Sequence, residues 1–181
     1  MLQDFIVPFM AVGLAELGDK TQLAVLCLAG KTKQYFQLIF GVMLAFILTD
    51  GLAVVFGDFI SKNIPVNYIK IISGVVFILF GIISIINSKE EEAKCELKKP
   101  FVSGFSLVFF AEMGDKTQIA SALFATKYNP LIVFISIISV LGLLSVLACA
   151  LGKYILAKVN RKLISRISGL LYIIIGVLFF F

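Results

Sequence analysis

The sequence predicts an all-α membrane protein whose six transmembrane helices form two inverted three-helix repeats. Three observations lead to this fold class: 60% of the 181 residues are hydrophobic, six long apolar segments follow one another, and an eight-residue motif occurs twice. The mean hydropathy is +1.06, and only 15% of the residues are charged, against about 25% in an average soluble domain. The composition therefore excludes an ordinary cytosolic enzyme and a disordered tail.

Six apolar segments define the expected helices, because a helix needs about 20 apolar residues to span a bilayer. They lie at about residues 5–29, 35–57, 68–87, 101–125, 130–152 and 163–181. The charged stretch SKEEEAKCELKKP, which holds four Lys and four Glu, separates the third segment from the fourth. We therefore divide the chain into a first repeat at residues 1–88, a charged linker at 89–100 and a second repeat at 101–181.

An internal repeat relates the two halves of the chain. AELGDKTQ at residues 15–22 recurs as AEMGDKTQ at 111–118, a shift of 96 positions, and a glycine pattern follows at a shift of 95, which pairs Gly81 with Gly176. Internal repeats of this kind are typical of secondary transporters. Three spans per repeat is an odd number, so the second copy is expected to cross the membrane in the opposite direction.

The basic residues predict the orientation. Eleven Lys and Arg residues lie in the connections after the first, third and fifth segments, and three lie on the other side. Since basic residues collect in cytoplasmic loops, we expect the linker to be cytoplasmic and both termini to lie on the non-cytoplasmic side, with the plasma membrane as the location. The net charge of +5 then reflects this orientation, and no nucleic-acid partner is predicted.

Four carboxylates lie near the middle of the first and fourth segments, where a charge costs on the order of 3 kcal/mol. They are Glu16 and Asp19 in the first motif copy and Glu112 and Asp115 in the second. We expect them to face the interior of the bundle and each other across a pseudo-two-fold axis. The chain contains no His, and its three Cys are far apart. The predicted site therefore offers oxygen ligands, which suit Ca²⁺, Mn²⁺ or Mg²⁺.

The other residues of each motif copy have expected roles around that site. Secondary oxygen ligands would be Thr21, Gln22, Thr117 and Gln118, and charge balance would come from Lys20 and Lys116. In a continuous helix the Glu, Asp and Lys at positions i, i+3 and i+4 share one face, while Gly18 and Gly114 would allow close backbone approach or local unwinding. The Glu–Lys spacing is also that of a salt bridge that only stabilises a helix, and this alternative stays open.

Asp50 is the other acid that the sequence places in an apolar segment, near the end of the second one. Its counterpart in the second repeat, at a shift of 95, is Ser145. An acid present in only one repeat would line an access path or accept a transported proton, or it would cap a helix end at the membrane surface. The sequence favours neither interpretation.

The doubled Glu-x-Gly-Asp-Lys-Thr motif, set in six hydrophobic segments around a charged central loop, resembles the Gdt-type cation/proton exchangers, once grouped as an uncharacterised protein family (UPF sixteen). The resemblance covers essentially the whole chain. It implies that the four motif acids bind the transported cation, that Mn²⁺, Ca²⁺ or both are exchanged for protons, and that the bacterial members resemble manganese exporters.

The sequence therefore predicts a secondary transporter, not an enzyme, that exports a divalent cation (Mn²⁺ is favoured, or Ca²⁺) in exchange for protons. That ion and protons are its expected substrates, the lipid bilayer is its surroundings, and no permanently bound cofactor is expected. The sequence has no nucleotide-binding P-loop, which leaves an ion gradient as the driving force. Two other functions stay open: a passive divalent-cation channel and a metal-dependent membrane enzyme.

Overall fold

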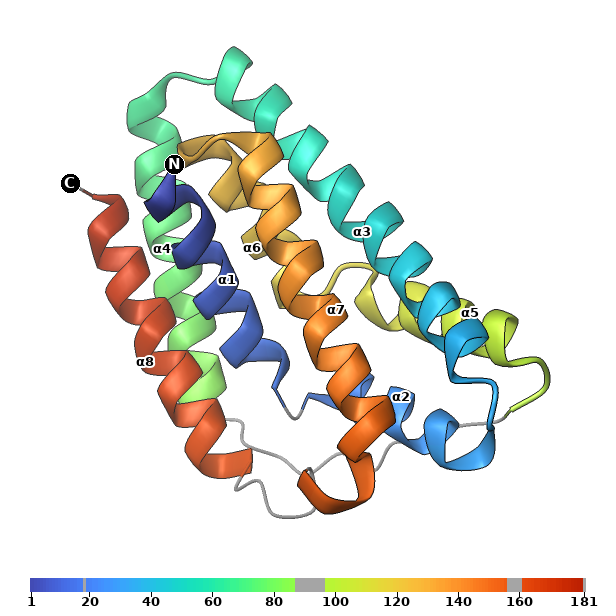
Figure 1. Cartoon of the computed structure of the whole chain (residues 1–181). Helices are drawn as coiled ribbons and strands as arrows, with labels where there is room; N and C mark the ends of the chain where they lie inside the picture. The colour runs from blue at the N-terminus through green and yellow to red at the C-terminus, as the bar shows by residue number, and fades with distance from the viewer. Residues whose placement is uncertain (18, 87–96, 156–160, 181) are drawn as a thin grey trace.

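The computed structural model describes residues 1–17, 19–86, 97–155 and 161–180. Their regular structure is helical, and no strand occurs in this part of the chain, which confirms the all-α prediction (Figure 1). The helices are α1 (Leu2–Glu16), α2 (Lys20–Lys31), α3 (Tyr35–Asn63), α4 (Val66–Ile86), α5 (Pro100–Glu112), α6 (Lys116–Lys127), α7 (Pro130–Ile155) and α8 (Arg161–Phe179). Most of the predicted linker at 89–100, and Gly18, lie outside the described residues.

Three of the described helices are long and apolar enough to cross a membrane. They are α3, α4 and the segment Pro130–Ala150 of α7, and two shorter apolar helices are α5 and the segment Arg166–Phe179 of α8. The chain is therefore an integral membrane protein. The count of six spans in two inverted repeats stays a prediction.

The first and fourth apolar segments are each split into two helices at the repeated motif. α1 ends at Glu16 and α2 begins at Lys20, while α5 ends at Glu112 and α6 begins at Lys116. The expectation that Glu, Asp and Lys share the face of one continuous helix is wrong for both copies.

The physical reason for the break lies in the residues between the two half-helices. Asp19 and Asp115 have extended backbones, as is typical of a residue that precedes a helix. Gly114 has a φ of +78°, a conformation that glycine adopts without the steric cost of a side chain. Local unwinding, the alternative that the glycine suggested, is confirmed at Gly114.

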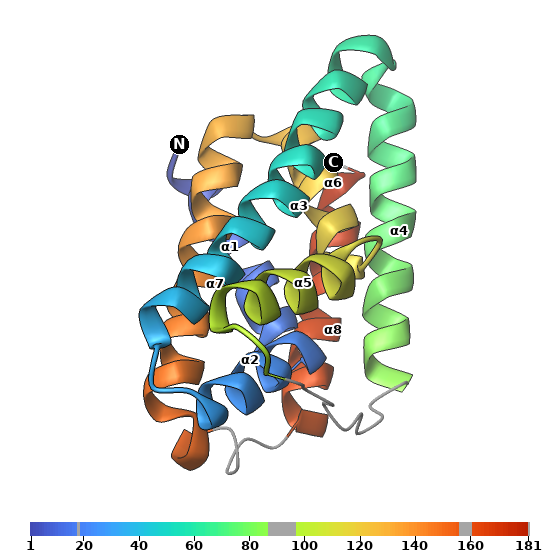
Figure 2. The ribbon, with the colours of Figure 1, turned by 90° about the vertical axis from the view of Figure 1, so that its right-hand side faces the viewer.

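The helices form a bundle in which both ends of the chain lie at the same end. The N- and C-termini are at one end of the bundle, and the connection between α2 and α3 is at the other (Figure 1). α4 and α8 run antiparallel in contact, α1 packs on α7, and α3 contacts α5, α6 and α7. Figure 2 shows α5 and α6 beside α3 on one face of this bundle. The two broken segments therefore each pack against a longer helix, α1 and α2 against α7 and α5 and α6 against α3.

Glycines allow α4 and α8 to approach closely. A Cβ atom on Gly81 would lie 2.5 Å from the carbonyl oxygen of Gly169, and one on Gly169 would lie 2.7 Å from that of Gly81. Gly74 and Gly176 make the same reciprocal contact, at 3.0 and 2.8 Å. Small residues are the usual means of close helix packing in membranes, and here a larger side chain would separate the two helices.

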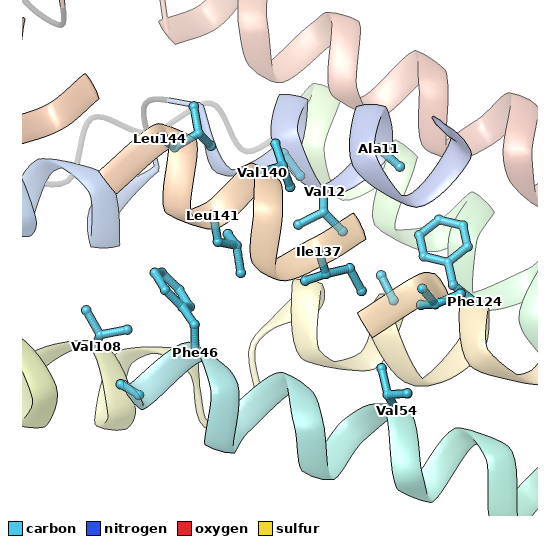
Figure 3. Packing of buried hydrophobic residues seen from close by; sticks show 14 of the residues in the cluster. Ala11, Val12, Phe46, Val54, Val108, Phe124, Ile137, Val140, Leu141 and Leu144 are labelled. Carbon is cyan, nitrogen blue, oxygen red and sulfur yellow. The ribbon is translucent and has the colours of Figure 1, made fainter. Parts of the chain in front are cut away.

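A continuous apolar core joins the two halves of the chain. Fully buried side chains include Val12 of α1, Phe46 of α3 and Phe124 of α6, which all belong to one cluster (Figure 3). Many large apolar side chains, such as Phe36 and Phe110, are exposed instead. An outward-facing apolar surface is expected of a protein whose solvent is lipid.

Candidate metal centre

The described residues of the two motif copies share their backbone geometry. In each copy the amide of the Asp donates to the carbonyl oxygen of the Glu, over 3.0 Å from Asp19 to Glu16 and 3.1 Å from Asp115 to Glu112. The ψ angles of the two Asp residues are 165° and 163°. The repeated sequence therefore specifies a repeated local structure that ends one helix and begins the next.

The two Asp side chains are not used to cap the helices that follow them. Asp19 and Asp115 occupy the N-cap positions of α2 and α6, where an Asp commonly accepts a hydrogen bond from an amide of the first turn. Neither side chain makes such a bond. Their carboxylates are consequently available to groups elsewhere in the bundle.

Three carboxylates from the two motif copies converge. Glu16, Asp19 and Asp115 each offer one oxygen, and these three oxygens all lie within 4.8 Å of one another. Two oxygens bound to one Ca²⁺ at 2.3–2.6 Å lie at most about 5 Å apart. The three groups are therefore close enough to bind the same ion.

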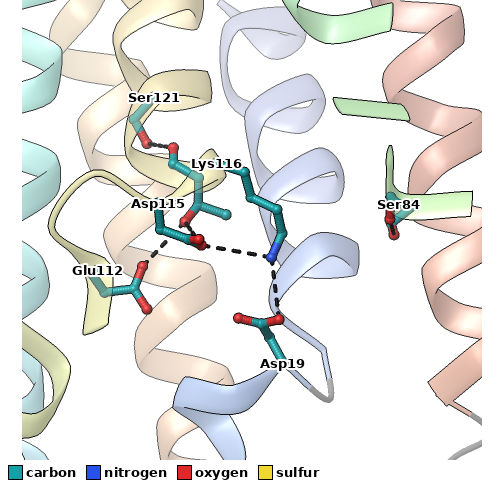
Figure 4. A network of polar contacts seen from close by, with 8 residues as sticks. Asp19, Ser84, Glu112, Asp115, Lys116 and Ser121 are labelled. Carbon is teal, nitrogen blue, oxygen red and sulfur yellow. Dashed lines mark hydrogen bonds and ion pairs between the residues drawn. The ribbon is translucent and has the colours of Figure 1, made fainter. Parts of the chain in front are cut away.

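Glu112, the fourth predicted ligand, is buried but lies outside this group of three. Its Oε2 lies 3.2 Å from the hydroxyl of Thr117, which donates to it and is also 3.4 Å from Asp115 Oδ2 (Figure 4). The structure thus brings three of the four predicted carboxylates together and connects the fourth to them through Thr117.

Lys116 links the two motif copies. Its Nζ lies 3.2 Å from Asp19 Oδ1 in the first repeat and 3.7 Å from Asp115 Oδ2 in its own repeat (Figure 4). Lys20, its counterpart in the first copy, is exposed. Two residues that are equivalent in the sequence therefore have different environments, and only Lys116 lies among the carboxylates.

Several buried polar atoms of this region have no hydrogen-bond partner among the described residues. They are both carboxylate oxygens of Glu16, one carboxylate oxygen each of Asp19 and Glu112, and both amide atoms of Gln22. A buried carboxylate without a partner is strongly unfavourable. A divalent cation would satisfy the oxygen atoms among them, though not the Gln22 amide nitrogen, and these oxygen ligands fit Ca²⁺, Mn²⁺ or Mg²⁺.

The neutral residues of the two motif copies also differ in their contacts. Thr21, Gln22 and Thr117 are buried. Gln118 is half-buried: its Oε1 accepts from the amide of Gly114 at 2.7 Å, and its Nε2 donates to the carbonyl of Thr49 at 3.1 Å. The Gln118 side chain thus holds the turn of the second copy against α3, whereas the Gln22 amide has no hydrogen-bond partner among the described residues.

Asp50 lies beside the second motif copy. It is buried in the middle of α3, and its Oδ1 accepts a hydrogen bond of 2.7 Å from Ser121 of α6. The interpretation of Asp50 as a cap at a helix end is therefore wrong. The counterparts of this pair in the other half of the chain are Ser145 and Val25, so the polar contact exists on one side of the bundle only.

Tyr172 of α8 is a residue that the sequence analysis missed. Its side chain is fully buried, its hydroxyl has no partner among the described residues, and it lies within electrostatic range of Lys116, Glu16 and the two motif Asp residues. The repeat could have pointed to it. At the shift of 95, Tyr172 corresponds to Phe77, so only the second repeat has a hydroxyl at this position.

These features define an integral membrane protein with a buried, oxygen-lined candidate site for a hard divalent cation between two copies of one motif. The chain belongs to the family of the divalent cation/proton antiporter GDT1, because the sequence profile of that family matches residues 4–92 and 100–181. This match confirms the resemblance that the doubled motif indicated. The family is one of transporters.

Two of the curated relatives described here match nearly the whole chain, and a third matches less than half of it. A protein of Vibrio cholerae with the name "Putative manganese exporter" is 30% identical over 173 residues, which are 94% of this chain and 86% of that protein. A GDT1-like protein of Synechocystis is 27% identical and covers 98% of this chain and 96% of that protein. The divalent cation/proton antiporter GDT1 of Saccharomyces cerevisiae is 31% identical over 77 residues, 42% of this chain and 27% of that protein. No solved structure matches the chain.

Proposed function

We propose that this protein is a secondary transporter that exports a divalent cation, Mn²⁺ by preference or Ca²⁺, in exchange for protons. The single observation that carries the proposal is the convergence of Glu16, Asp19 and Asp115, which come from both motif copies and lie inside a membrane protein. Glu112 joins them as a fourth ligand when the site is loaded, since Thr117 already connects it to Asp115.

The preference for Mn²⁺ rests on the name of the Vibrio cholerae relative and on the resemblance to bacterial manganese exporters. The oxygen ligands themselves suit Mn²⁺ and Ca²⁺ equally. We further propose that the protein resides in the plasma membrane with its linker in the cytoplasm and both termini outside, as the distribution of basic residues indicates.

Alternating access would come from two inverted three-helix repeats that move against each other around a fixed site. The contacts between α4 and α8 support this arrangement. At the shift of 95, Gly74 corresponds to Gly169 and Gly81 to Gly176, so the contact of Gly74 with Gly176 maps onto the contact of Gly169 with Gly81. Such reciprocal pairing is expected at a two-fold axis.

A second pair of contacts supports the same axis. Ser136 of α7 donates a hydrogen bond to the carbonyl oxygen of Phe5 in α1. The corresponding positions are Gly41 of α3 and Phe101 of α5, and Gly41 packs directly on the carbonyl oxygen of Phe101. The helix that follows each broken segment thus contacts the first half of the other broken segment.

We propose that one divalent cation is exchanged for two protons. The four motif carboxylates and Lys116 have a formal charge of −3 when all are ionised, because the exposed Lys20 lies apart from them. Replacing one divalent ion by two protons leaves the charge of the site unchanged, so the two loaded states have equal electrostatic cost in the membrane. The empty site carries two further negative charges, which disfavours its movement across the bilayer.

The experiment is metal flux in proteoliposomes that contain the purified protein. Uptake of Mn²⁺, Ca²⁺ and Mg²⁺ is measured side by side, with and without a pH gradient, while valinomycin and K⁺ hold the membrane voltage. We expect Mn²⁺ flux that increases with the pH gradient, depends little on voltage and is abolished in Asp19→Asn. The matched control is Asp58→Asn, which removes a carboxylate that pairs with Lys62 near the far end of α3.

Three outcomes would contradict the proposal in different ways. Flux that follows voltage and ignores the pH gradient would indicate a passive channel. Ca²⁺ flux without Mn²⁺ flux would remove manganese as the preferred substrate. Normal flux in Asp19→Asn would exclude the carboxylate cluster as the transport site.

A further inference from the structure

Tyr172 places a phenolic oxygen in the interior of the bundle. Its ring lies in α8 and packs on Phe77 and Phe80 of α4, with ring centroids 5.7 and 6.4 Å apart. The whole side chain is inaccessible to solvent. Packing alone would therefore be served by a Phe, the residue that the other repeat has at the equivalent position 77.

The hydroxyl of Tyr172 has no hydrogen-bond partner among the described residues. A buried Tyr hydroxyl usually has such a partner, and leaving it without one is unfavourable. The charged groups within its electrostatic range are Lys116, Glu16, Asp115 and Asp19. Three of these are the carboxylates that converge, and both oxygens of Glu16 are themselves without a partner.

A buried hydroxyl and buried carboxylate oxygens, all without a hydrogen-bond partner among the described residues and within electrostatic range of one another, suit a ligand shell that reaches both. Mn²⁺ and Mg²⁺ are octahedral ions, and ions of this kind keep water molecules in their shell when few protein ligands are available. Glu16, Asp19, Asp115 and the proposed fourth ligand Glu112, each in monodentate contact, would fill four of six positions. A water bound to the cation would fill a fifth position, and its hydrogen atoms could reach a hydrogen-bond acceptor outside the shell.

We propose that Tyr172 is a specificity-determining residue whose hydroxyl hydrogen-bonds a water molecule of the bound cation. This inference rests on the proposed function, because it assigns a further contact to the same site. The contact comes from α8 alone, since Phe77 offers no hydroxyl from α4. It favours a cation that keeps its water, such as Mn²⁺, over Ca²⁺, which accepts more protein oxygens and a less regular shell.

The test is Tyr172→Phe in the full-length purified protein, with Mn²⁺ and Ca²⁺ as separate probes in isothermal titration calorimetry. We expect the affinity for Mn²⁺ to fall about tenfold, the typical effect of one lost hydrogen bond in a site that retains its charges. The affinity for Ca²⁺ should fall less, so the ratio of the two affinities changes. Tyr128→Phe is the matched control, because it removes the same atom from a residue at the end of α6.

The thermal unfolding temperature without metal separates this role from a structural one. Because the hydroxyl has no hydrogen-bond partner among the described residues, Tyr172→Phe should unfold at the wild-type temperature or above it. A protein that unfolds earlier without metal, or fails to fold, would show that the hydroxyl has a structural partner and would overturn the inference.

The remaining outcomes distinguish this inference from the proposed function. Wild-type affinities for both ions in Tyr172→Phe would overturn the role of the hydroxyl and leave the transport proposal intact. Equal losses for Mn²⁺ and Ca²⁺ would overturn its role in selectivity. Absence of metal binding in the wild-type protein would refute the proposed function itself, and the inference with it.

Discussion

Lys116 and Lys20 are equivalent in the repeat, yet the structure predicts different consequences for the same substitution. The ammonium of Lys116 lies 3.2 Å from Asp19 and 3.7 Å from Asp115, which are two of the three carboxylates that converge. A cation that binds to these carboxylates must displace the ammonium. Lys116→Gln removes this competitor, so we expect it to bind Mn²⁺ more tightly than the wild-type protein.

The magnitude follows from the two distances. Coulomb's law at an effective dielectric constant of about 20 gives about 5 kcal/mol for each pair, which is an upper bound because desolvation offsets most of it. Both partners of the Asp19 pair are about one quarter exposed, which reduces the net value further. We take the net free energy of displacing the Lys116 ammonium as about 2 kcal/mol, which is typical of a hydrogen bond to a charged group. Removing this cost in Lys116→Gln corresponds to a roughly thirtyfold increase in the affinity for Mn²⁺.

The assay is calorimetric titration of Mn²⁺ into purified wild-type protein, Lys116→Gln and Lys20→Gln. The last variant is the control, because Lys20 is exposed and its loss should leave the affinity nearly unchanged. Lys116→Gln should also unfold at a lower temperature without metal and recover when Mn²⁺ is added, since Asp19 and Asp115 lose their cationic partner. An unchanged or weaker affinity in Lys116→Gln, or an equal gain in Lys20→Gln, would refute this account of the site.

Three further predictions concern the backbone, the helix packing and the orientation. Gly114→Ala should lower the free energy of unfolding by about 1–2 kcal/mol, because the φ of +78° at this position is unfavourable for a residue with a side chain. The control is Gly30→Ala in α2, which has open space around it and should not be destabilising in the same thermal unfolding measurement. Gly81→Ala should destabilise the protein by about 1–3 kcal/mol because its Cβ would meet the backbone of α8. The control Gly142→Ala, whose Cβ would meet only the flexible end of Met43, should be tolerated. Equal stabilities of the two variants would contradict the close packing of α4 on α8. The orientation is tested in a variant whose native cysteines have been replaced. Asn129→Cys, expected outside, should react with a membrane-impermeant thiol reagent in intact cells, whereas Gln34→Cys, expected in the cytoplasm, should react only after permeabilisation. The reverse pattern would reject the proposed orientation.

The sequence predicted which residues form the candidate site because burying charge in a membrane is so unfavourable. Glu16 and Asp19 lie in the middle of an apolar segment, and Glu112 and Asp115 repeat them 96 positions later. The structure places three of them together and the fourth nearby. Their role in transport stays a prediction, as does the proton or access role of Asp50.

Local geometry at the motif was less accessible from sequence. The spacing of Glu, Asp and Lys fits a continuous helix as well as a broken one, because i, i+3 and i+4 share a face only if the helix continues. The structure ends the helices at Glu16 and Glu112, and the two Asp residues become N-caps with unused side chains. The glycine of the motif was the only sign of this break.

The sequence alone determined the helical class, the membrane location and the four acids, because each follows from composition, hydropathy or exact repetition along the chain. Only the tertiary structure distinguished Lys116 from Lys20, excluded Glu112 from the group of three carboxylates and buried Tyr172 within electrostatic range of these groups. These differences depend on contacts between segments about 60 to 160 residues apart in the chain. A repeat in sequence specifies equivalent backbones, but the side chains that surround each copy belong to the other copy, and those side chains are not identical.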